Sequence, residues 1–447
     1  MRTYYTPINV AQVLARHVPK NLSRILEPAA GTGTLLEPLA ERLRGATKRV
    51  VCVDVNNEAL ERVKSRLGPI IGNRLKVVCS DFLEWSSPTR ILKNEQLFDC
   101  ILMNPPFAGR RENYVSINWA AELPGIGEGI HSVPTEVAFV LRSIRLLRPK
   151  GRLLAVVPSS LVSSLSTVWV RNYLLLSGAI RYVHELPRYT FKGLGSRVYL
   201  FVYEKAGRKQ PLLLSNHDLD EPESIRVREA ALTPELRFDY GFHAALRQYK
   251  ELIGCSKHLG WDELRAVADI YRGIIQSPNG ARKALHTYDF NNGFWHLANR
   301  KIRIQKDKTE RGIKRGDLLM KRVGRICSSS AGKIIGHIGC ASSDCLLIIR
   351  PNDVAMSLRL LFALRIILGF DFGAQLVERG TGAPYITEKS MLDLVIPLKL
   401  ANIYHRQYSA YHEAIIRRNF DAMLDIEKRV RYLLIRHIKR CEAHKPD

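Results

Sequence analysis

The sequence predicts an α/β fold in which a doubly wound, mostly parallel sheet carries helices on both faces. Short apolar runs alternate with amphipathic helical segments throughout the first half of the chain. This alternation is typical of strand–helix–strand units, because parallel strands need helical crossovers. Polar residues and glycines follow the first four strands, and ligands of such folds bind at the carboxyl ends of the strands. The sequence therefore predicts a ligand site at that edge.

The predicted strands of this half are short and apolar. They span residues 23–26, 50–53, 75–79, 98–103, 152–157, 180–186 and 198–203. The last two are expected to form a closing antiparallel pair. The predicted helices span residues 35–43, 58–67 and 135–147.

The second half of the chain has a different pattern. Residues 206–224 are polar, contain two prolines and are predicted to form a linker. Residues 232–252 are partly helical, and residues 261–400 contain short β-like segments broken by glycine and basic residues. The sequence therefore predicts a smaller, mixed α+β second domain.

The carboxy-terminal segment 404–440 contains neither proline nor glycine. Its apolar residues recur at three- and four-residue spacing, at Met423, Ile426, Val430 and Leu433, which predicts one long amphipathic helix. We therefore expect a catalytic domain over residues 1–245, a second domain over 246–400 and a terminal helix over 401–447.

A formal net charge of +25 over 447 residues predicts an anionic partner, nucleic acid first and an anionic membrane second. The membrane is disfavoured because no apolar stretch is long enough to span it. The best candidate, residues 356–374, carries Arg359, Arg365 and Asp371. The amino terminus also lacks the apolar core of a signal peptide. We expect a cytoplasmic, nucleoid-associated protein.

Cysteine usage indicates reduced thiols. Eight cysteines are scattered along the chain without a Cys-x-x-Cys pair. Cys52, Cys79 and Cys100 stand inside apolar strands, as buried free thiols do. Cys340 and Cys345 have no paired His or Cys set nearby, so we expect no metal.

The most informative motif is Asn104-Pro105-Pro106-Phe107, directly after the fourth strand. Proline fixes φ and donates no hydrogen bond, so the loop holds one shape and its carbonyl oxygens remain available as acceptors. An amide oxygen, a proline carbonyl and an aromatic face together suit a planar amine. This combination predicts methyl transfer to an exocyclic or amide nitrogen, with these four residues as the catalytic loop.

A second motif follows the first strand and opens a helix. The turn is Glu27-Pro28-Ala29-Ala30-Gly31-Thr32-Gly33, whose glycines allow close approach of a ligand. Asp54 ends the second strand, where its carboxylate can accept from ribose hydroxyls. Asp54 could instead cap the helix that follows it.

The third loop completes this half of the site. The Asp81 carboxylate can accept from an adenine amine and Phe82 can stack on the ring, unless they are a surface acid beside a core aromatic. A dinucleotide fits only part of the pattern, because Leu36 stands where its fingerprint has a third glycine. S-adenosylmethionine fits both halves of the site.

With these motifs in this order, residues 4–205 resemble the gamma-class N6-adenine DNA methyltransferases of restriction–modification systems. The resemblance includes Tyr5-Thr6-Pro7, where the family has a Thr-Pro near the methionine part of the cofactor. It also includes 147–151 before a strand, and Phe191 at the family's second base-stacking position. Phe107 departs from the more usual tyrosine but keeps the stacking face.

The resemblance implies a Rossmann-like methyltransferase domain that uses S-adenosylmethionine to methylate N6 of an adenine in duplex DNA. Because that atom lies inside the helix, the base must be flipped out. Phe107 would then stack on the base from one side and Phe191 from the other, although Phe191 could equally be a core residue. The cofactor-binding residues implied are Thr6, Glu27, Pro28, Ala29, Gly31, Gly33, Asp54, Asp81 and Phe82.

The carboxy-terminal part resembles the target-recognition domains of such enzymes and of type I specificity subunits. The resemblance rests on 261–273, 316–320, 379–385 and 392–398. Basic residues between 299 and 325 would contact phosphates, unless they form a solvated loop. The candidate DNA-binding residues are Lys301, Arg303, Arg322, Arg325 and Arg379.

Other functions fit parts of the same pattern. An RNA guanine-N2 methyltransferase can carry the same Asn-Pro-Pro-Phe loop, and a glutamine-N5 protein methyltransferase has a similar one. A non-catalytic DNA-binding specificity protein is a different class, disfavoured by intact Asp54, Asp81 and Asn104. No additional module precedes Thr6, so we expect a bacterial or archaeal methylase that acts alone or with a separate restriction endonuclease.

Overall fold

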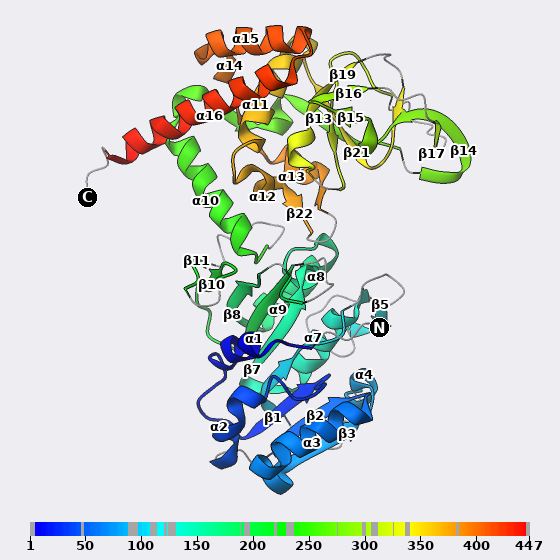
Figure 1. Cartoon of the computed structure of the whole chain (residues 1–447), viewed down its shortest axis with the longest axis vertical. Helices are drawn as coiled ribbons and strands as arrows, with labels where there is room; N and C mark the ends of the chain where they lie inside the picture. Colours follow the sequence, from blue (N-terminus) through cyan, green and yellow to red (C-terminus); the bar gives the residue numbers. More distant parts are fainter. Residues whose placement is uncertain are drawn as a thin grey trace. The chain divides into compact units, whose positions relative to one another are not determined.

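The computed structural model describes residues 5–45, 49–87, 97–107, 114–119, 123, 131–187, 189–191, 197–218, 221–228, 237–274, 276–296, 301–304, 312–324, 326–335, 340–380 and 384–443. The chain divides into two compact units, Met1–His243 and Ala244–Asp447. The boundary falls inside helix α10 (Tyr240–Cys255) (Figure 1).

The described part of unit 1 contains a nine-stranded sheet in the order β11-β10-β8-β9-β7-β4-β1-β2-β3. Its strands are β1 (Arg24–Pro28), β2 (Arg49–Asp54), β3 (Leu75–Cys79), β4 (Phe98–Met103), β7 (Leu147–Pro158), β8 (Gly178–Glu185), β9 (Val198–Lys205), β10 (Leu212–Ser215) and β11 (Ser224–Val227). All neighbours pair parallel except those of β9 and β11. The predicted doubly wound α/β fold is therefore confirmed.

Alternate residues of the central strands pack into two different cores. Ile25 and Val50 join one cluster, whereas their neighbours Leu26 and Val51 join the other. Successive side chains of a strand point to opposite faces, so a strand covered on both faces is buried along its length and mostly apolar. This explains why every residue of β4 is buried.

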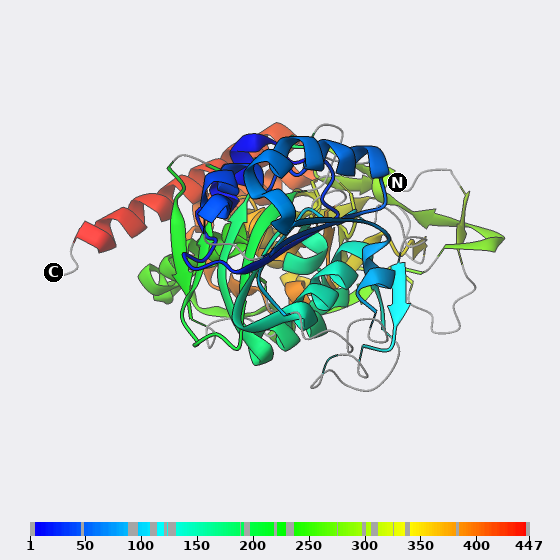
Figure 2. The ribbon, with the colours of Figure 1, turned by 90° about the horizontal axis from the view of Figure 1, so that it is seen from below.

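Helices cover both faces of this sheet. Figure 2 shows the blue helices between residues 8 and 71 on one side of it and the teal helices on the other. The described helices of unit 1 before α10 are α1 (Ile8–Ala15), α2 (Ala40–Gly45), α3 (Asn57–Ile71), α4 (Phe82–Trp85), α7 (Thr135–Leu146), α8 (Ser159–Val162) and α9 (Val168–Ser177). A separate hairpin pairs β5 (Tyr114–Ile117) with β6 (His131–Pro134).

Two element boundaries and one linker predicted for unit 1 differ from the structure. The helix expected at 35–43 begins as a 3₁₀ turn, Glu37–Leu39, with a proline at its start. The strand expected at 152–157 starts earlier, because Leu147 already pairs with Phe98. The linker expected at 206–224 contains β10, which pairs with β8 and buries Leu212 and Leu214. The antiparallel pair β8–β9 is present, but β10 and β11 extend the sheet beyond it.

Unit 2 is mixed α+β. Its described strands include a six-stranded sheet in the order β13-β21-β18-β19-β16-β15, formed by β13 (Ala268–Arg272), β21 (Leu346–Pro351), β18 (Leu318–Lys321), β19 (Gly332–Ile335), β16 (Phe294–His296) and β15 (Phe290–Asn291). Smaller sheets pair β12 (Trp261–Glu263) with β24 (Val395–Pro397), β14 (Gln276–Leu285) with β17 (Lys301–Ile304) and β20 (Ala341–Ser342), and β22 (Glu378–Arg379) with β23 (Tyr385–Ile386).

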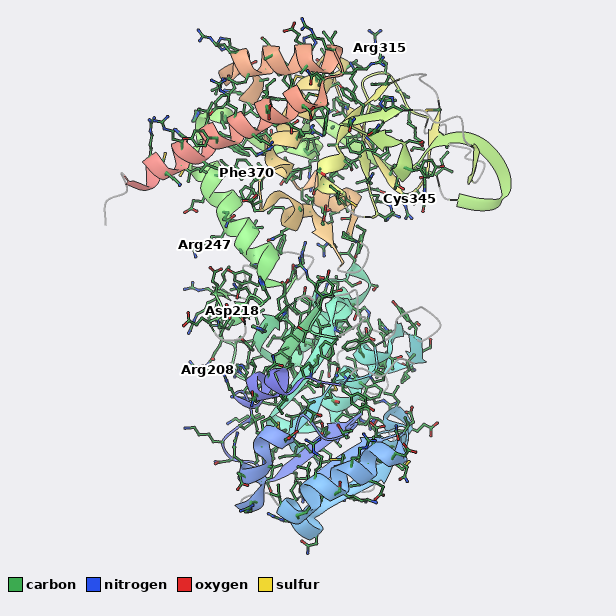
Figure 3. The ribbon with its side chains drawn as sticks, in the orientation of Figure 1. Arg208, Asp218, Arg247, Arg315, Cys345 and Phe370 are labelled. Atoms are coloured by element: carbon green, nitrogen blue, oxygen red, sulfur yellow. The ribbon has the colours of Figure 1, made fainter. Side chains whose placement is uncertain are left out.

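The core of unit 2 surrounds helix α11 (Ser357–Leu368), which is buried from Leu360 to Leu368. The other helices are α12 (Gly373–Val377), α13 (Glu388–Leu392), α14 (Leu400–Ile403), α15 (His405–Ile416) and α16 (Phe420–Ala443). Phe370, labelled in Figure 3, stacks on Phe372 at 4.9 Å in the same core. The apolar stretch 356–374 is thus largely a core helix, and no described helix is long and apolar enough to cross a membrane.

The single helix predicted for 404–440 was wrong. Arg418 adopts a left-handed conformation (φ 54°), which ends α15. The Asn419 side chain then accepts a hydrogen bond from the backbone N–H of Ala422 at 3.1 Å and caps α16. Tyr411 and Val430, one from each helix, belong to the same core as α11, so this segment folds as part of unit 2.

We predict that Glu427→Ala destabilises unit 2 strongly. The Arg365 guanidinium donates to Glu427 at 2.5 Å, and both side chains are almost fully buried. Removing the carboxylate leaves a buried unpaired charge, which costs about 3–5 kcal/mol. The control, Glu413→Ala, removes an exposed pair with Arg417 and should cost about 0.5 kcal/mol or less. Urea unfolding of the full chain measures both, and equal losses would contradict the assignment.

Candidate active site

The carboxyl edge of the parallel strands holds a cavity of about 400 Å³. This volume lies in the range of small-molecule sites. Its wall comes from the loops after β1, β2, β3 and β4, from the residues before α1, and from α7. Of the residues predicted from sequence, those lining it are Thr6, Glu27, Ala29, Gly31, Asp54, Asp81, Phe82, Asn104, Pro105, Pro106 and Phe107.

Three predicted residues of unit 1 are not part of the cavity wall. Pro28 ends β1, and Phe191 lies in the core. Gly33 has a φ of 77°, and a Cβ there would lie 3.3 Å from Val63 on α3. Gly33 therefore lets the turn pack closely against α3, which is a scaffolding role.

Asp54 joins the first two loops. Its Oδ2 accepts from the Gly31 N–H at 2.7 Å, and its Oδ1 accepts from the Asn56 N–H at 2.9 Å. The cap of α3 is Asn56, whose side chain accepts from the Ala59 N–H. The helix-cap alternative for Asp54 is therefore wrong. A carboxylate has about four acceptor positions, so Asp54 retains capacity for a ligand.

Glu27 is a buried acid with an unsatisfied oxygen. The residue is 1% exposed and lines the cavity, and its Oε2 has no hydrogen-bond partner among the described residues. Burial raises the pKa of Glu27 well above its usual value, and the nearby Asp54 carboxylate raises it further. The neutral form of Glu27 is therefore favoured relative to that of an exposed glutamate, and its Oε2 is available to a polar group.

Asp81 and Phe82 have mixed roles. Asp81 Oδ1 accepts from the N–H groups of Leu83 at 2.7 Å and Glu84 at 3.2 Å, which caps α4. Phe82 is 2% exposed and packs against Phe139 at 4.9 Å. The pair thus has the structural role of a cap beside a core aromatic, and both residues also line the cavity.

The loop after β4 is joined to the residues before α1. The Asn104 Nδ2 donates to the Thr6 Oγ1 at 3.0 Å, across 98 positions of sequence. Thr6 is buried, so this bond fixes the orientation of the Asn104 amide. The amide nitrogen faces Thr6, and the amide oxygen is on the opposite side of the group. The structure therefore brings together two motifs that the sequence placed far apart.

The two aromatic residues predicted to hold a base are neighbours. The rings of Phe107 and Phe191 lie 6.4 Å apart and meet edge to face at 76°. Phe107 is half-buried and lines the cavity, whereas Phe191 is 4% exposed. The buried Phe191 ring therefore packs against Phe107 and has no exposed face on which a base could stack.

Sequence reasoning missed several residues of the wall, among them Tyr5, Val55, Leu83 and Phe139. The first three are adjacent in sequence to Thr6, Asp54 and Phe82, so proximity to a motif could have identified them. Phe139 is one of many buried positions on α7, and nothing local distinguishes it.

The candidate DNA-binding residues of unit 2 are only partly described. The side chains of Lys301 and Arg303, and the whole of Arg325, lie outside the described residues. Arg322 is half-buried and its Nε donates to the Asp344 carbonyl at 2.5 Å. Arg379 is 2% exposed, so its predicted contact with DNA is not compatible with this structure.

The described residues contain no group of three or more His, Cys, Asp or Glu side chains placed to hold a metal ion. Cys52 and Cys100 are buried free thiols, but Cys79 is exposed, contrary to prediction.

The raised pKa of Glu27 predicts a pH dependence of stability. Because the folded protein keeps the proton that the unfolded chain loses above about pH 4.3, stability falls as pH rises toward the folded pKa. Relative to Glu27→Gln, the wild-type free energy of unfolding should fall as the pH rises above the pKa of the unfolded chain. Urea titrations of both proteins at pH 5, 6 and 7 measure this slope, and parallel curves would contradict a neutral Glu27.

Comparisons with known proteins give one family. A family model described as N-6 DNA methylase matches residues 1–251. No curated protein matches the chain. The structure of the type IIG restriction endonuclease BpuSI is similar with a TM-score of 0.49 and 14% identity, covering 96% of this chain and 60% of that one. The type I methyltransferase subunit from Streptococcus thermophilus gives a TM-score of 0.41 and 19% identity, covering 55% of this chain and 53% of that one.

The chain therefore spans 60% and 53% of the lengths of these two proteins. The family match includes all the motifs that line the cavity and more than half of the chain. On this ground, the chain belongs to the N-6 DNA methylase family.

Proposed function

We propose that unit 1 transfers a methyl group from S-adenosylmethionine to N6 of an adenine that has been flipped out of duplex DNA. One observation carries this proposal. A single cavity has the Gly31 turn and Asp54 on its wall together with the Asn104-Pro105-Pro106-Phe107 loop. A donor and an acceptor bound there would meet inside one enclosure, as a direct transfer requires.

The cavity wall suits the polar groups of the donor. Asp54 is partly exposed and would accept from the ribose hydroxyls with the capacity that its two backbone bonds leave. Asp81 would accept from the adenine amine through Oδ2, beside the edge of Phe82. The unsatisfied Oε2 of Glu27 is a further polar contact within the wall. When bound, S-adenosylmethionine supplies an electrophilic methyl group on a positively charged sulfur.

The catalytic loop prepares the acceptor. The nitrogen of an adenine amine is a poor nucleophile, because its lone pair is shared with the ring. The Asn104 oxygen and the Pro105 carbonyl would accept its two protons and localise that lone pair on nitrogen. The bond from Asn104 to Thr6 keeps the amide oxygen as the acceptor, and the prolines keep the loop rigid. The loop thus contributes positioning and electrostatics that are in place before the reaction.

Reaching the cavity requires an extruded base. Unstacking and unpairing one nucleotide costs a few kcal/mol. Stacking on the half-buried Phe107 ring would return about 1–3 kcal/mol of this cost. The excess of basic residues would supply the rest through phosphate contacts, with unit 2 as the proposed target-recognition part. We also propose that the protein works alone or beside a separate restriction endonuclease.

The most direct test is to express the chain in a host and sequence the host DNA for N6-methyladenine. The proposal expects methylated adenines in one short sequence context, which also defines the recognition duplex. Binding of S-adenosylmethionine by calorimetry, without any methylated adenine, would favour the RNA or protein methyltransferase alternatives. Absence of both S-adenosylmethionine binding and methylated adenine would favour a non-catalytic DNA-binding protein.

Asn104→Ala should lower the methylation rate about 10²–10³-fold or more, because it removes an acceptor that acts in the transition state. Affinity for the donor should stay near that of the wild type. Asn402→Ala, an exposed asparagine of unit 2 that contacts Arg359, is the matched control and should leave both unchanged. Transfer of tritiated methyl groups to the recognition duplex measures the rate. Methylation retained in Asn104→Ala would remove the proposed role.

Phe107→Ala should weaken use of the duplex by about 5- to 150-fold, which corresponds to a stacking loss of about 1–3 kcal/mol. Phe107→Tyr keeps the ring and should retain most of the activity. Steady-state kinetics on the recognition duplex separates the two variants. If tyrosine and alanine were equally damaging, packing against Phe191 rather than stacking on a base would be the role of this ring.

A further inference from the structure

Tyr189 combines two unusual properties. It is 85% exposed, the highest value for a large apolar side chain among the described residues. Its backbone is left-handed, with a φ of 71°. A bulky residue rarely adopts this conformation, because its Cβ crowds the following carbonyl oxygen. The Tyr189 ring is therefore exposed to solvent although its backbone is strained. Packing of the ring against the protein does not account for this conformation.

The turn around Tyr189 is built to hold this strain. The backbone N–H of Thr190 donates to the Pro187 carbonyl at 3.2 Å, and the Thr190 hydroxyl donates to the same oxygen at 2.6 Å. Two bonds to one acceptor close the turn, and proline fixes φ at its start. Strained residues that the surroundings hold in place cluster at functional sites.

The turn stands beside the proposed base-binding wall. It follows β8, which runs parallel to β7 because both pair antiparallel with β9. The turn therefore lies at the same sheet edge as the loop after β4. Two residues further on, Phe191 is buried and its ring meets that of Phe107. The turn thus precedes one aromatic that is anchored in the core against Phe107, and it projects a second aromatic into solvent.

We propose that Tyr189 inserts into the DNA duplex and occupies the stack position that the flipped adenine leaves, which rests on the proposed function of unit 1. Apolar and aromatic side chains that enter a base stack offset the cost of unstacking. A tyrosine ring has two stacking faces, and its hydroxyl can remain at the wet edge of the stack. The ring is already exposed, so insertion requires no unpacking of the protein core.

The first measurement uses 2-aminopurine in place of the target adenine in the recognition duplex. Its fluorescence rises when the base leaves the helical stack. Tyr189→Ala should shift the flipping equilibrium by about 5- to 150-fold, the range expected for loss of one stacked ring. Tyr189→Phe should behave like the wild type. Tyr432→Ala, an exposed tyrosine of α16, is the control and should change nothing.

The second measurement separates insertion from a general defect. A duplex in which the target adenine faces an abasic site has a lower flipping cost. Methylation of this substrate by Tyr189→Ala should therefore approach the wild-type rate, whereas methylation of the fully paired duplex stays low. An equal loss on both substrates, or no loss on either, would overturn the proposal.

A glycine at this position tests the strain directly. Glycine adopts a positive φ without the Cβ clash, so Tyr189→Gly should raise the melting temperature or leave it unchanged while flipping falls as in Tyr189→Ala. A lower melting temperature would make Tyr189 a structural residue and contradict insertion. If the wild-type protein neither flips nor methylates the target adenine, the proposed function fails. If the wild type is active and Tyr189→Ala flips and methylates the adenine equally well, only the inserted role of Tyr189 fails.

Discussion

Four parallel strands that end at one edge are the constraint on which the rest of the molecule depends. β4, β1, β2 and β3 are neighbours in that order, so the loops after them converge even though they are distant in sequence. A parallel sheet needs a crossover between each pair of strands, and here α3 supplies one from β2 to β3. The crossovers also keep water from both faces, which leaves the polar edge as the natural place for a ligand.

Preorganisation follows from the hydrogen bonds at that edge. Asp54 ties the turn at Gly31 to the loop before α3, and Asn104 ties the loop after β4 to Thr6. The same side chains that would bind a ligand therefore already hold the loops that surround it. Such a site loses little conformational entropy on binding. A substitution at Asp54 therefore changes the loop geometry and the ligand contacts together. Its effect can be assigned only when loop structure and ligand binding are measured separately.

The sequence was a good guide where structure is local and a poor one where it is tertiary. Apolar runs predicted the central strands, and the motifs around them predicted about half of the residues that line the cavity. β10 was missed because Pro211 and polar residues surround its three leucines. The break between α15 and α16 was missed because it contains neither proline nor glycine. Arg418 ends α15 in a left-handed conformation, and the Asn419 side chain caps α16. The burial of Arg379 depends on packing that no local pattern records.

The net charge also needs a structural interpretation. Arg142, Arg171, Arg237, Arg365 and Arg379 are all buried, at 7% exposure or less. Arg171 is fully buried and donates to the carbonyls of Leu161 and Ser164, so it acts as an internal brace between α8 and the start of α9. Such arginines count toward the formal charge but cannot reach a phosphate. The remaining excess of basic residues is still large, because these five are a small part of 68 lysines and arginines against 43 acids. Attraction to a polyanion must therefore come from the exposed cations, and it should be screened by salt, whereas the internal arginines contribute to stability at any ionic strength.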